Sequence, residues 1–272
     1  MSLPDNPVRA SVGRVVGLWR YPVKSMGGEV LARAEIAEAG IVGDRAFGVF
    51  DADTGNVLTA KRVPQLLAAA AAWRSDGEVS ITLASADDGV SASMSSDDAD
   101  VDAQLSSWLG RPVQLRRPAP GARSTVQMET DLDDPTALFE FPTPPGTLFD
   151  SRAVLHLLTP ASLRSGESLH PGGRWVTARF RPNVLVETPE GPQGWVEDAW
   201  VGSELHLGGV RVTVRKPCQR CVMTTRAQPG VERDLEVMRT LSAFHDANLG
   251  VYLDVTGAGT VLVGDEVLQG PG

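Results

Sequence analysis

The most informative stretch of this sequence reads Lys216-Pro217-Cys218-Gln219-Arg220-Cys221-Val222-Met223-Thr224-Thr225. It holds both cysteines of the chain and follows an apolar, alternating run from Glu204 to Arg215 that predicts a strand. Two cysteines separated by two residues, in a chain of 272, do not form a disulfide framework. The pair therefore indicates chemistry at the end of a strand.

A Cys-x-x-Cys pair serves as a redox couple, as half of a zinc site, or as the source of one thiolate ligand. Zinc needs more ligands, and the four histidines show no paired spacing. A thioredoxin-like couple needs its first cysteine at the start of a helix, whereas the residues after Cys221 favour β structure. Nearby cations at Arg215, Lys216, Arg220 and Arg226 would stabilise a thiolate. A thiolate metal ligand and a buried structural pair both stay open.

Strand-like segments separated by glycine and proline recur along the whole chain. The expected strands are 15–21, 28–37, 45–51, 153–158, 179–187, 204–215, 250–255 and 260–267. Residues 64–73 fit either a strand or a short helix, and the acidic, serine-rich residues 85–102 read as an exposed loop. Helices are expected at 102–109, from Thr159 as N-cap to 168, and between 233 and 248. The expected class is mainly β (α+β) with a few helices.

Residues 118–145 are rich in proline, aspartate and threonine, which is typical of a boundary between two halves. The net charge of −9 argues against nucleic acid or an anionic membrane as a partner. Among the first 20 residues the apolar run spans only Val15 to Leu18, too short for a signal peptide or a membrane span. A cytoplasmic location is therefore expected. The chain has only three lysines, at 24, 61 and 216, and two of them lie in motifs.

Two further motifs suggest anion binding. Lys24, Ser25 and two glycines, followed by Gly43-Asp44-Arg45, could cradle an anion with side-chain and backbone donors. In Arg179-Phe180-Arg181-Pro182-Asn183, the two arginines and Asn183 would share one face of a strand. Such a face suits a phosphate and the amide edge of a heterocycle, although an exposed ion-pair surface has the same pattern.

Five motifs in order carry a resemblance to a known family: Tyr-Pro-Val-Lys-Ser, Gly-Asp-Arg, Arg-Phe-Arg-Pro-Asn, Cys-x-x-Cys with Thr-Thr, and Val-Gly-Asp at 263–265. Together they resemble the MOSC proteins, relatives of the carboxy-terminal domain of molybdenum cofactor sulfurase, over residues 9–268. The branch with a preceding β-barrel domain, which includes the mitochondrial amidoxime-reducing component and its bacterial counterparts, is the most similar. This resemblance implies a β-barrel domain at 9–125 packed on a MOSC β-barrel domain at 126–268.

The resemblance also implies a molybdenum cofactor (Mo-molybdopterin) held between the two domains. Cys221 matches the position that ligates molybdenum. The positions matching cofactor contacts are Lys24, Ser25, Arg45, Arg181, Asn183, Gln219, Arg220 and Tyr252, with Ser151 and Thr159 matched to within a residue or two. Gln219 stands where some relatives have serine.

The activity implied is reduction of an N-hydroxylated small molecule. Two cysteines cannot hold a four-thiolate iron–sulfur cluster, so electrons would come from a separate flavoprotein, ferredoxin or haem protein. The alternatives are a sulfur carrier using a cysteine persulfide, a cofactor-storage protein, and a pyridoxal-phosphate enzyme with Lys24 as the Schiff-base lysine.

Overall fold

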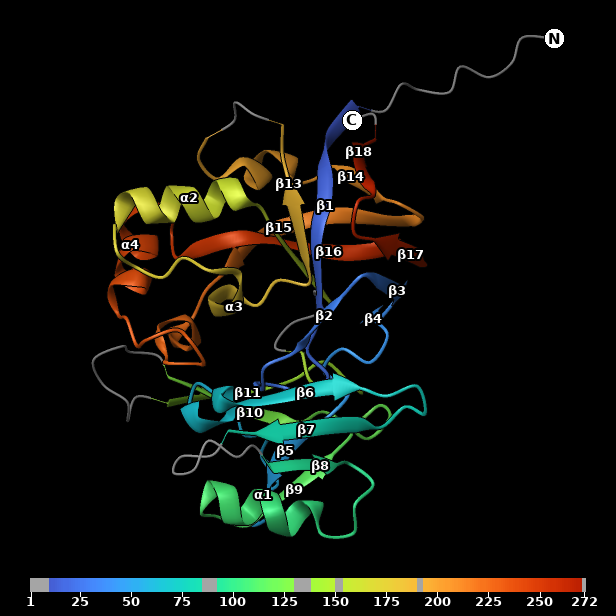
Figure 1. Cartoon of the computed structure of the whole chain (residues 1–272), viewed down its shortest axis with the longest axis vertical. Coiled ribbons are helices and arrows are strands. Elements are labelled where there is room, and N and C mark those ends of the chain that lie inside the picture. Colours follow the sequence, from blue (N-terminus) through green and yellow to red (C-terminus); the bar gives the residue numbers. More distant parts are fainter. Residues whose placement is uncertain (1–9, 85–91, 130–137, 150–153, 190–192, 271–272) are drawn as a thin grey trace, which may run out of the picture.

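The computed structural model of the chain describes residues 10–84, 92–129, 138–149, 154–189 and 193–270. Within these ranges the protein has eighteen strands, four α-helices and three short 3₁₀ helices. Figure 1 shows a larger part above, which holds the longest strands, and a smaller β part below that ends in one helix. The prediction of a mainly β fold with a few helices is confirmed.

Seven strands close a barrel in the larger part, in the order β13-β12-β16-β15-β14-β18-β1, because β1 pairs with both β18 and β13. Their bounds are β1 Ala10–Arg20, β12 Leu155–Leu158, β13 Val184–Glu187, β14 Glu204–Leu207, β15 Val210–Gln219, β16 Asn248–Gly257 and β18 Glu266–Gln269. β12 and β13 pair in parallel, and the other pairs named here are antiparallel. The first strand of the chain thus belongs to a barrel built mainly from its second half.

The alternation of β15 shows why this segment forms a barrel strand. Val210, Val212 and Val214 are fully buried, while Arg211 and Arg215 between and beyond them are exposed. Burying one such side chain stabilises the fold by about 1.5–3 kcal/mol. The period-2 pattern in the sequence therefore fixes which face of the strand lines the core.

Short elements extend the barrel on two sides. β2 (Glu29–Leu31) pairs with β1, and β3 (Arg33–Ala37), β4 (Gly40–Ile41) and β17 (Gly259–Leu262) form a three-stranded sheet. The helical elements are α2 (Pro160–Leu169), α3 (Thr177–Phe180), α4 (Glu236–Phe244), η2 (Val196–Trp200) and η3 (Val222–Thr225). The three α-helices α2, α3 and α4 share an apolar cluster that includes Phe180, Leu241 and Leu249.

The smaller part is a set of short sheets with its own core. In one sheet β5 (Gly48–Asp51) pairs with β9 (Val113–Arg116), and in a second sheet β10 (Thr125–Glu129) pairs with β11 (Leu138–Pro142). A third sheet consists of β6 (Ala69–Trp73), β7 (Val79–Leu83) and β8 (Ala92–Ser95). The helical elements of this part are η1 (Pro64–Ala68) and α1 (Val101–Leu109). Fully buried Met26, Leu66, Ile81 and Leu105 lie in its core. α1 ends at Gly110, whose left-handed conformation (φ 65°) closes the last turn, as the sequence predicts.

Several local predictions were wrong or incomplete. The expected loop at 85–102 contains β8, and the ambiguous segment at 64–73 is a 3₁₀ helix followed by a strand. The expected boundary at 118–145 contains the hairpin β10–β11, with residues 130–137 outside the described ranges. The helix expected between 233 and 248 is shorter, and Phe244 at its end is 61% exposed. The division of the chain into domains at residue 125 stays a prediction.

Candidate functional site

Side chains from both parts of the fold meet between the barrel and the smaller sheets. The Tyr21 hydroxyl donates to the Pro182 carbonyl at 3.1 Å, and the Arg45 guanidinium donates to Asn183 Oδ1 at 3.4 Å. Arg220, just after β15, donates to the Phe180 carbonyl at 2.7 Å. Arg45, Arg181 and Arg220 are called the cation cluster below. The structure thus brings together three of the motifs singled out in the sequence.

Tyr21 is the centre of the cation cluster. Its ring centroid lies 4.1 Å from the Arg181 guanidinium carbon and 5.0 Å from that of Arg45. The ring faces attract the two cations, an interaction that gains strength away from water. Burial raises the pKa of the Tyr21 hydroxyl to about 12, so the phenol stays neutral and keeps donating its hydrogen bond.

Asn183 and Asp44 fix the relative position of the segments that meet at the site. The Asn183 amide nitrogen donates to the Trp19 carbonyl at 3.2 Å and to Asp44 Oδ2 at 3.1 Å. Its oxygen accepts from the His156 backbone N–H and from Arg45. All four hydrogen-bonding positions of this amide are therefore used within the protein. Asn183 contributes to the site as an organiser of its neighbours.

Backbone strain is concentrated around this junction. Five described residues other than glycine have positive φ: Ser25 (71°), Arg45 (49°), Arg181 (53°), Asp246 (48°) and Ala247 (59°). Three of them are predicted site residues, and the other two lie in the turn that contacts Arg220. A non-glycine residue in this region costs free energy and persists only where its surroundings hold it. Such clustering is typical of a functional site.

Arg181 carries a charge that is almost completely buried. It is 5% exposed, and burial lowers the pKa of its guanidinium to about 10, so it is still protonated at neutral pH. Its electrostatic neighbours are the cations Arg45 and Arg220, with Asp44 as the acidic side chain beside them. Buried charges of one sign are costly unless they are balanced. The cation cluster is therefore suited to an anion.

The two cysteines have different environments. Cys218, on β15, is 1% exposed, and its sulfur lies 2.9 Å from a terminal guanidinium nitrogen of Arg220. Cys221 is partly exposed and has extended backbone dihedrals. Because Cys218 lies in a strand, an extended path to Cys221 would separate the Cα atoms by about 10 Å, beyond the reach of a disulfide. This geometry favours Cys221 as the accessible thiol.

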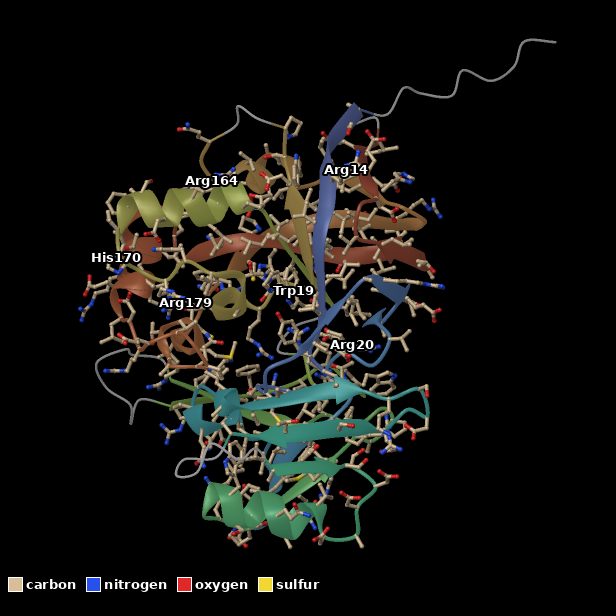
Figure 2. The ribbon with its side chains drawn as sticks, viewed as in Figure 1. Arg14, Trp19, Arg20, Arg164, His170 and Arg179 are labelled. Atoms are coloured by element: carbon tan, nitrogen blue, oxygen red, sulfur yellow. The ribbon has the colours of Figure 1, made fainter. Side chains whose placement is uncertain are left out.

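The residues after Cys221 do not continue a strand, as their β propensity predicted, but form the 3₁₀ helix η3. The Arg179 guanidinium holds this helix in place by donating to the carbonyls of Arg174, Thr224 and Glu232 at 2.9, 2.8 and 3.1 Å. Figure 2 labels Arg179 on α3. The side chain is 1% exposed and lies among backbone acceptors. Tertiary hydrogen bonds therefore override local propensity here.

The shared strand face expected for Arg179, Arg181 and Asn183 was wrong. Arg179 lies in the short helix α3, Arg181 caps that helix in a left-handed conformation, and β13 begins only after Asn183. The change of backbone direction sends the two arginines to different places. Arg179 supports η3, whereas Arg181 joins the cation cluster.

Lys24 and Ser25 lie on the side of the site formed by the smaller part. The Lys24 ammonium donates to the Leu148 carbonyl at 2.6 Å, and the Ser25 hydroxyl accepts the Ala60 N–H at 3.0 Å. Both side chains are buried. A lysine that donates to a carbonyl as a buried ammonium is poorly prepared to form a Schiff base, so the geometry does not favour the pyridoxal-phosphate alternative.

Of the remaining predicted site residues, Tyr252 acts electrostatically on Arg220 of the cation cluster, and the others have separate places. Thr159 caps α2 and donates to Glu197 Oε2 at 2.7 Å, a structural role. Gln219 is exposed and pairs with Asn248. Tyr252 lies on β16 with its ring 6.2 Å from that of His156. Ser151 lies outside the described residues.

Sequence reasoning missed Asp44 and His156 as parts of the site. Asp44 accepts the Tyr21 N–H at 2.7 Å and pairs with Arg45. His156 is buried, and burial together with the nearby Arg220 charge lowers its pKa to about 3, so the ring is neutral. A polar residue inside the apolar strand β12 was the available signal for His156.

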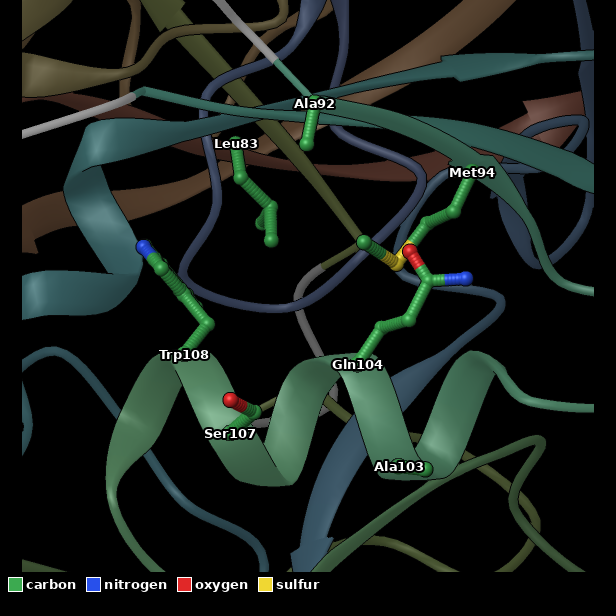
Figure 3. Close-up of a pocket in the computed structure, with 7 residues that line it drawn as sticks. All are labelled: Leu83, Ala92, Met94, Ala103, Gln104, Ser107 and Trp108. Atoms are coloured by element: carbon green, nitrogen blue, oxygen red, sulfur yellow. The ribbon is translucent and has the colours of Figure 1, made fainter. Parts of the chain in front are cut away.

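Three further findings concern other kinds of site in the described residues. No group of three or more His, Cys, Asp or Glu side chains there could hold a metal, so the zinc interpretation gains no further ligands. No helix in the described ranges is long and apolar enough to cross a membrane. A hollow of about 440 Å³ between β8 and α1 is lined by seven uncharged residues (Figure 3), and it belongs to the smaller part, away from Cys221.

A solved structure shares this architecture. The crystal structure of the YUAD protein from Bacillus subtilis covers 97% of this chain and 99% of its own, with a TM-score of 0.50 and 10% identity. Models of two domains match the sequence, the MOSC N-terminal beta barrel domain at residues 12–114 and the MOSC domain at residues 146–268. The chain therefore belongs to the MOSC family, as the order of its motifs predicts.

Curated relatives resemble the chain over most of its length. Mitochondrial amidoxime-reducing component 1 of Mus musculus is 24% identical over 94% of this chain and 82% of its own. Mitochondrial amidoxime reducing component 2 of Homo sapiens is 24% identical over 95% of this chain and 84% of its own. The molybdenum cofactor sulfurase of Bos taurus is 23% identical over 98% of this chain but only 33% of its own length.

Proposed function

We propose that this protein binds a molybdenum cofactor at the cation cluster and reduces N-hydroxylated compounds with electrons from a separate redox partner. The observation that carries the proposal is the cation cluster itself: the buried Arg181 lies with the partly buried Arg45 and Arg220 beside a partly exposed cysteine, in a chain with net charge −9. An acidic protein has no general reason to gather cations inside. A phosphate-bearing cofactor would supply the balancing anion.

The residues fit such a group. Within the described ranges Arg220 Nε is buried and has no hydrogen-bond partner. An unsatisfied buried donor costs free energy, and a bound acceptor would remove this cost. Arg45 and Arg181 offer planar donors for phosphate, and Lys24 adds a compact charge. Cys221 would provide one soft sulfur ligand. The cofactor, when bound, supplies the two-electron chemistry.

The protein's own contribution is then positioning and charge. Tyr21, Asn183 and Asp44 fix the arginines, and the buried surroundings strengthen every electrostatic contact. Electrons would come from a flavoprotein, ferredoxin or haem protein, because the two cysteines cannot hold an iron–sulfur cluster of the four-thiolate kind. The names of the amidoxime-reducing relatives support this reaction class.

Protein produced in a host that makes the cofactor is expected to carry about one molybdenum per chain, and protein from a cofactor-deficient host is expected to fold without metal, because its apolar cores need no structural metal. Elemental analysis and fluorescence of the oxidised pterin measure this. Tightly bound zinc with no molybdenum from either host would contradict the proposal. Metal-free protein that accepts labelled sulfur on cysteine from a desulfurase would support the sulfur-carrier alternative instead.

Arg181→Ala is expected to lower cofactor retention by roughly ten- to a hundredfold while leaving the unfolding midpoint of the metal-free protein almost unchanged. The charge-assisted bond lost is worth about 1.5–3 kcal/mol, and removing a buried charge near two other cations relieves repulsion in the metal-free state. Retention after dialysis and thermal unfolding are measured on the same preparations. Equal losses of stability and of cofactor would identify Arg181 as a structural residue.

A further inference from the structure

The turn that joins α4 to β16, residues 245–248, supports Arg220. The Arg220 backbone N–H donates to the Ala247 carbonyl at 2.7 Å, and the neighbouring Gln219 pairs with Asn248. Arg220 itself reaches Cys218 and the Phe180 carbonyl with its side chain. The position of this arginine therefore depends on the shape of the turn.

This turn is strained. Asp246 and Ala247 are consecutive, neither is glycine, and both have left-handed φ angles of 48° and 59°. Three backbone hydrogen bonds close the helix end and the turn: the His245 and Ala247 N–H groups donate to the Leu241 carbonyl, and the Asn248 N–H donates to the His245 carbonyl. Two successive non-glycine residues in this conformation cost free energy, because most side chains avoid it, so a further constraint from neighbouring side chains favours the turn.

His245 provides that constraint. Its Nδ1 lies 2.8 Å from the Asn248 carbonyl and its Nε2 lies 2.6 Å from Asp198 Oδ2. The ring stacks on Trp195 with centroids 4.3 Å apart and an angle of 6° between the planes. Both ring nitrogens face acceptors, and only the protonated ring can donate from both.

We propose that His245 is a positioning residue for Arg220: fixed between Asp198 and Trp195, it holds the turn in the conformation that presents the Ala247 carbonyl to the Arg220 N–H. The importance of this for turnover rests on the proposed function, in which Arg220 faces the cofactor. The coupling between His245 and Arg220 does not, because it is a property of the protein alone.

The charges around His245 make the constraint sensitive to pH. Two acidic groups of η2, Glu197 and Asp198, act electrostatically on the His245 ring. The Arg220 guanidinium points away from this ring, because it donates to Cys218 and to the Phe180 carbonyl. Burial opposes the charged ring, but the bond with Asp198 and the Asn248 carbonyl prevail and raise its pKa above 6.5. A raised pKa means that the stabilisation is complete at acidic pH and is lost as pH rises through the folded-state value.

Amide hydrogen exchange at Arg220 tests the proposal directly. In the full-length, metal-free protein, protection of the Arg220 amide, corrected for intrinsic exchange, is expected to fall about tenfold between about pH 5.5 and pH 8.5. In His245→Gln, which keeps a donor but cannot titrate, protection is expected to be low at both pH values. NMR titration of the His245 ring in the wild type should give a midpoint in the same pH range.

Two variants separate positioning from general destabilisation. His206→Gln is the matched control, because His206 pairs with Glu204 at 2.9 Å, but on β14 and away from the turn. It is expected to leave Arg220 protection and its pH dependence unchanged. The double variant with His245→Gln and Ala247→Gly should recover part of the Arg220 amide protection that His245→Gln loses, because glycine adopts positive φ without strain.

Protection at Arg220 that is the same in wild type and His245→Gln, or that falls equally in His206→Gln, would overturn the proposal. The proposed function fails in a different experiment, the absence of molybdenum from protein made with the cofactor pathway intact. If the protein contains no molybdenum but still shows the pH-dependent protection of the Arg220 amide, the positioning role of His245 stands and the proposed oxidoreductase function is refuted.

Discussion

Cys221→Ala is expected to abolish both molybdenum retention and the reduction of a simple N-hydroxylated test compound by a chemical electron donor, whereas Cys218→Ala should keep most of both. The reason is that only the partly exposed thiol of Cys221 is accessible to a ligand, while Cys218 is buried in β15. One protein thiolate suffices to complete the coordination in the proposed site. Molybdenum content and turnover are measured for both variants in the same preparations.

The two cysteine variants also decide between the alternatives. A dithiol redox couple would lose activity in both variants while keeping full molybdenum in both, and this result would refute Cys221 as the metal ligand. A persulfide carrier would keep cofactor occupancy in Cys221→Ala. Because Cys218 contacts Arg220, Cys218→Ser serves as a second control that retains a polar group near the guanidinium.

Arg179→Met is expected to destabilise the metal-free protein by about 3 kcal/mol or more. The change leaves the buried Thr224 carbonyl without its donor, at a cost of about 1–3 kcal/mol, and also removes the part-buried hydrogen bonds to the Arg174 and Glu232 carbonyls. η3 and the segment leading into α4 should loosen together, because Arg179 joins them. Denaturant unfolding followed by tryptophan fluorescence measures the loss.

Arg181→Met is the matched control, since it removes another nearly buried guanidinium only two residues away. It is expected to change the free energy of unfolding by less, because Arg181 stacks on the Tyr21 ring near other cations instead of bonding three backbone carbonyls. A larger loss of stability in Arg181→Met than in Arg179→Met would contradict the structural role assigned to Arg179. Equal losses would mean that burial alone, not the partners, sets the cost.

The sequence predicted the strands well where one pattern dominated. The N-cap Thr159 and the Gly110 stop gave the expected structure, because each depends on a local interaction. The valines of β15 lie in a strand as expected, but the single strand predicted at 204–215 is in fact the two antiparallel strands β14 and β15. The order of five motifs identified the family. The resemblance to that family over residues 9–268 could therefore be seen in the sequence alone.

The errors arose where distant residues decide local conformation. Arg179 and Arg181 were expected on one strand face, but α3 and a left-handed Arg181 separate them. η3 forms against the propensity of its residues, since Arg179 supplies partners from another segment. Asp44 was noted only as part of the Gly43-Asp44-Arg45 motif and His156 was given no role, because the importance of both comes from burial beside arginines.

The pairing of β1 has a consequence for how the chain folds during synthesis. β1 is made before its barrel partners β13 and β18, which lie at 184–187 and 266–269, and its nearby partner β2 pairs only with Leu18–Arg20. The barrel cannot close until residue 269 has been made, and until then most of β1 presents unpaired backbone edges. Such long-range pairing slows folding, because the paired strands are far apart in the sequence.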